Sequence, residues 1–310
     1  MIKMQLFCPA TVRCIARQIP KRHGLNQYFI FCTGKDTFMP ITADCHLHSS
    51  YSGDSDTPME EMILQGIEKG LTTMCFTEHN DFGYPDFPGE PGERFLLHVD
   101  PYLYDLLRLR EKYAGQIRIL FGVELGLQPE VMRQNAVLAK SYDFDFIIGS
   151  SHLCHGKDPY YPYFYEGRPE EEAYREYFES ILENIKKFSN FDVYGHLDYV
   201  VRYGPNKDAE YTYEKYKDIL DKILELLIEK GKGIEINTGG IKSGLKELHP
   251  CMGILKRYRE LGGEIITIGS DAHTPESIAA HFDRAYEVLK ECGFQYYTIF
   301  ENRTPEFKKL

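Results

Sequence analysis

Seven short apolar segments alternate with amphipathic stretches along most of this chain, and that alternation restricts the fold more than any other feature. Each segment is about five residues long, rich in β-branched or aromatic side chains and bounded by turn residues, which is typical of buried strands. The segments are ITADC at 41–45, TTMCF at 72–76, IRILF at 117–121, FDFII at 144–148, FDVYG at 191–195, GIEIN at 233–237 and EIITI at 264–268. Strands that alternate with helices predict parallel βα units.

The number of these units favours a barrel. Seven repeats, with a candidate last strand near 296–300, are typical of a closed or distorted barrel rather than of an open doubly wound sheet. The turn after the first strand reads HSSYSGD and lacks the GxGxxG pattern of dinucleotide-binding folds. The predicted fold class is therefore α/β, a distorted (β/α)7 TIM-like barrel. At its first helix, Thr57 with Glu60 forms a capping-box pattern that predicts a start at Pro58.

The alternation also divides the chain. Residues 1–39 do not follow it, so we expect an N-terminal extension of unknown role before a single barrel domain at 40–310. Two long connections, 81–115 and 153–169, are aromatic and rich in Pro or Gly. Such segments are typical of loops that cover a functional site.

Composition narrows the classes of partner. Because 47 acidic residues outnumber 36 basic ones, the formal charge is −11, which argues against general nucleic-acid binding but allows a small anionic substrate. No stretch is apolar and long enough to span a membrane, and no secretory signal is evident. The eight cysteines lack a CxxC pair, which favours free thiols in a reducing compartment. We expect a cytoplasmic protein without nucleic-acid or membrane partners, and the oligomeric state stays open.

Polar side chains follow the predicted strands at their C-terminal ends, where α/β barrels gather their functional groups. Six of the seven ends carry His, Glu or Asp, and the seventh carries Asn237 and a Gly-Gly turn. Nine of these residues are candidate metal ligands: His46, His48, Asp54, His79, Glu124, His152, His196, Asp271 and His273. Because one catalytic ion takes about three or four protein ligands, nine candidates indicate two or three ions that share a carboxylate. Imidazole with carboxylate suits Zn, Mn or Fe better than Ca or Mg.

The remaining histidines, His23, His98, His155, His249 and His281, do not follow strand ends, so we expect them to have no role as ligands.

The motifs at these strand ends resemble, in order and spacing, those of the polymerase and histidinol phosphatase (PHP) family. They are HLHSSYSGD at 46–54, TEH at 77–79, GVE at 122–124, GSSH at 149–152, GH at 195–196 and SDAH at 270–273. Within that family, HLDYVVRYG at 196–204 and INTGG at 236–240 resemble histidinol-phosphate phosphatases. The resemblance implies a PHP-type barrel with three divalent metal ions.

The resemblance also implies how the ligands divide among the ions. The first ion would take His46, His48, Glu124 and Asp271; the second would take Glu124, His152 and His196, with Glu124 as the bridge; the third would take Asp54, His79 and His273. Asp54 stands where many members carry His, which favours harder ions at the third position.

The activity that the resemblance implies is hydrolysis of a phosphate monoester, with L-histidinol phosphate in histidine biosynthesis as the leading substrate. A water held between two cations is a competent nucleophile near neutral pH. Arg202 is predicted to bind the phosphate bidentately, and Lys242 is a second phosphate-binding candidate. The proton donor to the leaving group is left open among Asp271, His196 and a metal-bound water.

Three other functions stay open. A PHP phosphoesterase could act on nucleotides or other small phosphate esters, because the aromatic loop at 160–165 suits an imidazole or a nucleobase. An amidohydrolase-like barrel also begins with HxH but does not need Asp54, His79 and His273 as a third set. A non-catalytic PHP module of a DNA polymerase is disfavoured by the intact ligand set and by the lack of a polymerase region.

Overall fold

The structure, a computed structural model, describes residues 13–18, 28–33, 40–87 and 91–310. The chain divides into two compact units, Met1–Met39 and Pro40–Leu310. In the first unit, β1 (Arg13–Gln18) pairs antiparallel with β2 (Tyr28–Thr33). The assignment of residues 1–39 as an N-terminal extension and of residues 40–310 as a single barrel domain stays a prediction.

The second unit is built around seven parallel strands that follow one another in sequence order. They are β3 (Ala43–Leu47), β4 (Thr73–Asn80), β5 (Arg118–Gly126), β6 (Phe146–Ser150), β7 (Val193–Tyr194), β8 (Gly233–Asn237) and β9 (Ile266–Gly269). The first and last strands meet where His48 N donates to the carbonyl of Ala272 at 2.9 Å and Asp271 N donates to that of His46 at 2.8 Å. The sheet is thus nearly closed, which confirms the predicted distorted (β/α)7 barrel.

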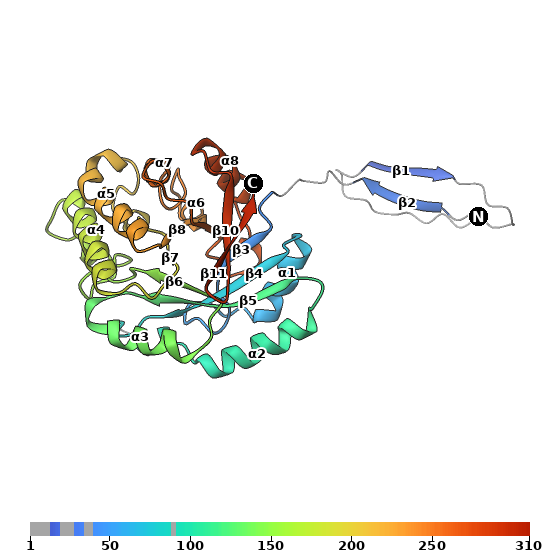
Figure 1. Cartoon of the computed structure of the whole chain (residues 1–310), viewed down its shortest axis with the longest axis horizontal. Helices are drawn as coiled ribbons and strands as arrows, with labels where there is room; N and C mark the ends of the chain where they lie inside the picture. Colours follow the sequence, from blue (N-terminus) through green and yellow to red (C-terminus); the bar gives the residue numbers. More distant parts are fainter. Residues whose placement is uncertain (1–12, 19–27, 34–39, 88–90) are drawn as a thin grey trace. The chain divides into compact units, whose positions relative to one another are not determined.

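Helices connect the strands and lie around the sheet (Figure 1). The α-helices are α1 (Met59–Glu68), α2 (Val99–Lys112), α3 (Met132–Ser141), α4 (Glu170–Lys187), α5 (Tyr213–Glu229), α6 (Gly239–Lys242), α7 (Met252–Glu260) and α8 (Phe282–Glu291). Short 3-10 turns are η1 (Gly92–Phe95), η2 (Pro129–Val131), η3 (Pro162–Phe164), η4 (Tyr199–Arg202) and η5 (Pro275–Ser277). Because helices cover the outside and side chains fill the inside, β3, β4, β6, β8 and β9 are buried along their full length.

The candidate strand near 296–300 exists but is not part of the barrel. It is β10 (Tyr296–Glu301), which pairs antiparallel with β11 (Thr304–Lys309) in a separate hairpin. The chain reverses at Asn302 and Arg303, whose φ values of 50° and 60° are those of a tight hairpin turn. The strand therefore pairs with the segment that follows it and adds no eighth strand to the barrel.

The predicted capping box at the first helix is wrong. Helix α1 begins after Pro58, and no side chain caps it. The Thr57 hydroxyl instead donates to the carbonyl of His273 at 3.0 Å, and the Glu60 carboxylate accepts a hydrogen bond from Tyr113 Oη at 2.5 Å. Long-range partners therefore replace the local cap. Thr57 ties the start of α1 to the loop after β9, and Glu60 ties it to the end of α2.

The two long connections differ from each other. The segment 81–115 is a loop only over its first part, because Tyr102, Leu106 and Leu109 give α2 a buried stripe at helical spacing. The segment 153–169 has no α-helix and contains only η3. Both loop portions reach the C-terminal side of the barrel strands, where they line a cavity together with site residues.

Five cysteines with described side chains, Cys45, Cys75, Cys154, Cys251 and Cys292, are free and buried, as predicted. The expectation for Cys8, Cys14 and Cys32 falls outside the described side chains. Among the helices in the described ranges, none combines the length and apolar character that crossing a membrane requires.

Helix α2 offers a test of how the helical layer is attached to the sheet. The buried Tyr102 hydroxyl donates to the carbonyl of Phe76 at 2.9 Å and lies 3.0 Å from that of Gly122. We expect Tyr102→Phe to lower the free energy of unfolding by about 1–3 kcal/mol, because buried acceptors lose their donor. Urea denaturation measures the change. Tyr104→Phe, at a side chain that is 74% exposed on the same helix, should shift it by less than about 0.5 kcal/mol. Equal effects would contradict the assignment.

Candidate metal centre

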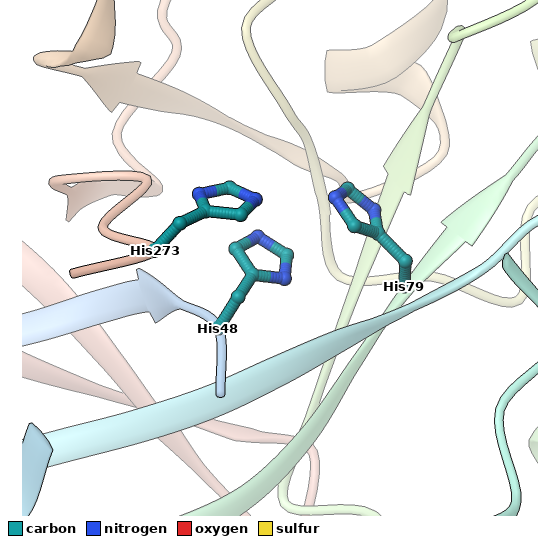
Figure 2. Close-up of side chains that lie close together, drawn as sticks. All are labelled: His48, His79 and His273. Carbon is teal, nitrogen blue, oxygen red and sulfur yellow. The ribbon is translucent and has the colours of Figure 1, made fainter. Parts of the chain in front are cut away.

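Three imidazoles from three different chain segments lie face to face at the C-terminal side of the barrel (Figure 2). The rings of His48 and His79 stack with centroids 4.2 Å apart, and those of His48 and His273 stack at 4.3 Å. His48 follows β3, His79 lies near the end of β4, and His273 follows β9. The near-closure of the barrel brings these distant segments together.

Glu124 lies at the centre of the cluster, near the end of β5 and fully buried. Its Oε1 is 2.8 Å from His196 Nε2 and 3.2 Å from His152 Nε2. Its Oε2 is 2.9 Å from His79 Nδ1 and 3.2 Å from His46 Nε2. One carboxylate thus lies within 3.2 Å of four imidazoles, two at each oxygen, and His48 Nε2 is 3.7 Å from Oε2. This is the arrangement that a bridging ligand needs.

Two further carboxylates complete the cluster. Asp54 Oδ2 lies 3.2 Å from His273 Nε2 and 3.5 Å from His79 Nε2. Asp271 Oδ1 lies 3.5 Å from His48 Nε2 and 3.8 Å from the Nε2 atom of His46. The structure therefore brings together all nine residues that the sequence analysis selected as candidate ligands.

The strand ends place these groups through local constraints. Asp271, two residues after the end of β9, has a φ of 55°, a left-handed conformation that Asp tolerates better than most residues. Two residues earlier, Gly269 leaves no room for a side chain, because a Cβ atom there would lie 2.2 Å from the Cβ of His46. This close approach allows the first and last strands to present their ligands at one place.

Neighbouring polar groups fix the orientation of three imidazoles. His46 Nδ1 is 2.6 Å from Glu235 Oε1, His152 Nδ1 is 2.7 Å from Asp81 Oδ1, and His48 Nδ1 is 2.9 Å from Ser52 Oγ. Ser52 Oγ donates to Glu78 at 2.6 Å, so it accepts from His48. Each Nδ1 therefore carries the proton and donates it outward, which leaves the Nε2 lone pair directed at the cluster. Metal-binding histidines typically have this second hydrogen bond.

The sequence analysis missed the carboxylates Glu78, Asp81 and Glu235. Glu235 would have been the easiest to find, because GIEIN places a charged residue in the middle of a strand that reads as buried. Side chains two apart in a strand share a side, so Glu235 faces the same way as Asn237. It accepts from His196 N at 2.9 Å in addition to its contact with His46.

In the described part of the chain, four buried atoms of the cluster make no hydrogen bond: His79 Nδ1, Glu124 Oε2, His196 Nδ1 and His273 Nε2. Three of them lie within ion-pair distance of other atoms of the cluster, but these contacts lack hydrogen-bond geometry. Unsatisfied buried polar atoms are costly, and native proteins rarely leave several of them together. Imidazole nitrogens and carboxylate oxygens are also the atoms that first-row divalent cations prefer. The residues present therefore fit a divalent metal centre.

The electrostatics of the bare cluster agree with that fit. Burial lowers the pKa of His46, but Glu235, Glu124 and Asp271 together raise it well above its ordinary value. Burial and the neighbouring His79 and His273 lower the pKa of His48 well below its ordinary value. The carboxylates thus favour positive charge nearby. The six crowded imidazoles cannot all be protonated at once, because neighbouring rings lower one another's pKa. Divalent cations would supply it while they bind the neutral rings.

A cavity opens above the cluster, and Arg202 is part of its wall. Both terminal nitrogens of Arg202 lie 3.3 Å from Asp271 Oδ2. Lys242, the second phosphate-binding candidate, is not among the residues that line the cavity; it is exposed and donates to Ser277 Oγ at 3.0 Å. Arg94, which the sequence analysis did not select, does line it and donates to the carbonyl of Gly53 at 2.9 Å.

Most of the remaining histidines lie apart from the cluster. His155 contacts Glu176 at 3.1 Å on the surface, and the prediction for His23 falls outside the described residues. His249 is different, because it is fully buried between Asp198, 2.5 Å from its Nδ1, and Arg202, whose Nε donates to its Nε2 at 3.4 Å. It therefore supports the guanidinium, a role that its position outside the strand-end pattern concealed.

Glu235 gives a test of this layer around the imidazoles. We expect Glu235→Gln to weaken metal binding by about 10- to 100-fold, because His46 loses the carboxylate that orients its ring. Competition with a chromophoric chelator measures the affinity. The control Glu229→Gln removes an exposed carboxylate from the end of α5 and should leave affinity unchanged. Equal affinities for the two variants would show that Glu235 has no such role.

Comparison with known proteins places this geometry in a family. The sequence profile of the PHP domain family matches residues 44–239. A protein from Clostridium acetobutylicum named probable histidinol-phosphatase is 35% identical over 265 residues, which are 85% of this chain and 98% of that protein. A histidinol-phosphatase from Lactococcus lactis is 33% identical, over 83% of this chain and 93% of its own length.

A solved structure has the same fold. It is the histidinol phosphate phosphatase from Lactococcus lactis in complex with Zn, L-histidinol and phosphate. It superposes with a TM-score of 0.77 at 32% identity and covers 86% of this chain and 98% of its own. The sequence match and the shared fold agree, and this chain belongs to the PHP domain family.

Proposed function

We propose that this protein is a metal-dependent phosphate monoester hydrolase that converts L-histidinol phosphate and water to L-histidinol and phosphate. The observation that carries the proposal is the cavity in which Arg202 lies beside nine clustered imidazole and carboxylate side chains. A guanidinium binds phosphate through a planar pair of N–H groups, and the cluster suits divalent cations. The match to two histidinol-phosphatase relatives covers 98% and 93% of their lengths, and it supports the choice of substrate.

Three divalent ions, Mn, Zn or Fe, are proposed for the cluster. His46, His48, Glu124 and Asp271 would hold the first, Glu124 with His152 and His196 the second, and Asp54 with His79 and His273 the third. When bound, such ions lower the pKa of a shared water and offset charge on the phosphoryl oxygens. The contacts of Glu124 with four imidazoles support its role as a bridge.

The side chains of this protein orient the ester. Arg202 is held from two directions, by Asp271 and by His249, so its guanidinium plane is fixed before a substrate arrives. Such preorganised donors stabilise charge that develops on the phosphoryl group without paying for reorientation during the reaction. Asp271 and His196 both line the cavity, which keeps each of them a candidate for the proton transfer to the leaving oxygen.

The rival amidohydrolase reading needs only two metal positions. The contacts of Asp54 with His79 and His273 favour a third position and therefore the phosphatase. A non-catalytic module would not need the cavity above the cluster.

A substrate screen tests the proposal. Protein loaded with Mn, Zn or Fe, with its metal content measured, should release phosphate from L-histidinol phosphate with a higher kcat/KM than from nucleoside monophosphates or sugar phosphates. Treatment with a chelator should abolish the activity, because the nucleophile depends on the ions. A higher kcat/KM for a nucleotide than for L-histidinol phosphate would make the nucleotide the substrate instead. Protein that is inert at every metal loading would overturn the assignment as an enzyme.

Arg202 offers a second test. We expect Arg202→Met to lower kcat/KM for L-histidinol phosphate by about 100-fold or more, because the phosphoryl oxygens lose a fixed cationic donor. The matched variant Lys242→Met removes the other predicted phosphate ligand. Because Lys242 is exposed and contacts Ser277, we expect less than about a twofold change. A larger loss in Lys242→Met than in Arg202→Met would reverse the two assignments.

A further inference from the structure

Two loops meet above the cavity, and a buried carboxylate lies where they touch. Tyr84, in the loop after β4, donates its hydroxyl to Asp158 Oδ2 at 2.5 Å, and Asp158 belongs to the loop after β6. The rings of Phe87 and Tyr161 stack between the same loops with centroids 4.0 Å apart. Tyr84, Asp158 and Tyr161 all line the cavity that opens above the metal-ligand cluster.

Asp158 is only 4% exposed, yet within the described ranges it has no Lys, Arg or His nitrogen at ion-pair distance. It accepts from Tyr84 and from Tyr160 N, the latter at 2.7 Å. Burying a carboxylate away from water is costly unless a cation or several donors compensate. Burial raises the pKa of Asp158 to about 6, although the hydrogen bonds from Tyr84 and Tyr160 N and the nearby His152 lower it. The carboxylate would therefore gain from a positive group in the cavity.

Aromatic rings line the same cavity as Asp158. The rings of Tyr160 and Tyr203 lie edge to face at 5.3 Å, those of Tyr203 and Tyr199 at 5.0 Å, and all three line the cavity. Aromatic faces attract cations and also pack against a flat heteroaromatic ring. A small molecule that carries an ammonium group and an imidazole has the chemistry that these walls match.

The lining of the cavity consequently carries charges of both signs. Arg202, together with the proposed ions, attracts a phosphate, and the Asp158 carboxylate repels any second anionic group and attracts a cation. Selectivity arises from such repulsion as much as from attraction. A nucleotide with further phosphates and a sugar bisphosphate would bring negative charge toward Asp158, whereas an amino phosphate ester would bring its ammonium group.

We infer that Asp158 is the specificity-determining residue that recognises the positively charged end of the phosphate ester. The inference rests on the proposed phosphatase function and names the residue that selects a cationic ester over a neutral or anionic one.

The experiment compares Asp158→Asn with the wild type in metal-loaded, full-length protein. Phosphate release is measured for two cationic esters, L-histidinol phosphate and O-phosphoethanolamine, and for phenyl phosphate, which is aromatic and carries no cation. We expect kcat/KM for the better cationic ester to fall by at least about tenfold, mainly through KM, because the ammonium group loses the negative charge of its partner. The value for phenyl phosphate should change by less than about twofold.

Two further variants separate charge from structure. Glu166→Gln removes an exposed carboxylate from the same loop but outside the cavity, and it should leave the preference for cationic esters unchanged. Tyr84→Phe keeps the Asp158 carboxylate and should retain most of the preference. Thermal unfolding of each variant checks that the loop is folded, and a folded Tyr84→Phe protein keeps the comparison informative if Asp158→Asn is unstable.

The outcomes distinguish this inference from the proposed function. An unchanged ratio between the cationic ester and phenyl phosphate in Asp158→Asn, or an equal loss on both, would overturn the role of Asp158 while leaving the phosphatase intact. Loss of the Asp158-dependent preference also in Tyr84→Phe would shift the role to the phenol and overturn it likewise. A wild type that prefers O-phosphoethanolamine would overturn the histidinol assignment alone, and a wild type inert toward every ester would overturn both.

Discussion

A single buried carboxylate, that of Glu124, is the contact on which the rest of the site depends. Its two oxygens reach imidazoles that come from four different places in the chain, at distances from 2.8 to 3.2 Å. Such convergence is possible only if the strand ends meet in one plane around the barrel, as parallel strands in a closed sheet do. The proposed metal centre therefore depends on the register of the barrel, since a shift of register in any of these strands would displace a proposed ligand.

Much of the barrel and of the cluster of candidate ligands could be predicted from the sequence, because both depend on local sequence patterns. Strand period, strand length and the polar residue at each strand end are all visible within a few positions. Contacts between distant segments were not. The hydroxyl of Thr57 donates to a carbonyl more than 200 residues away instead of capping the helix beside it. The strand pattern contains Glu235 but does not show that its partner is His46. Lys242 faces Ser277 because a helical turn follows β8, which spacing alone does not reveal.

The cavity joins a strong general reaction centre to a selective entrance. The cluster and Arg202 suit any phosphate monoester, and a PHP enzyme that acted on nucleotides would need the same groups. Substrate selection would then depend on the loops after β4, β6 and β7, which supply the aromatic residues and Asp158 that line the cavity. The loops after β4 and β6 are joined by the contacts of Tyr84 with Asp158 and of Phe87 with Tyr161. Barrels commonly separate the two tasks in this way, with chemistry on strand ends and selectivity on loops.

The seam between β3 and β9 has a further consequence. The strands that close the barrel also carry His46, His48, Asp271 and His273, so the gap that the backbone bridges with few hydrogen bonds is the gap that the ligands span. A cation bound across this gap would hold together segments that are more than 200 residues apart in the chain. The entropy cost of bringing two segments together rises with the length of the loop between them. Loading with metal and final closure of the barrel would then be one event, and a protein stripped of its ions would loosen first along that seam.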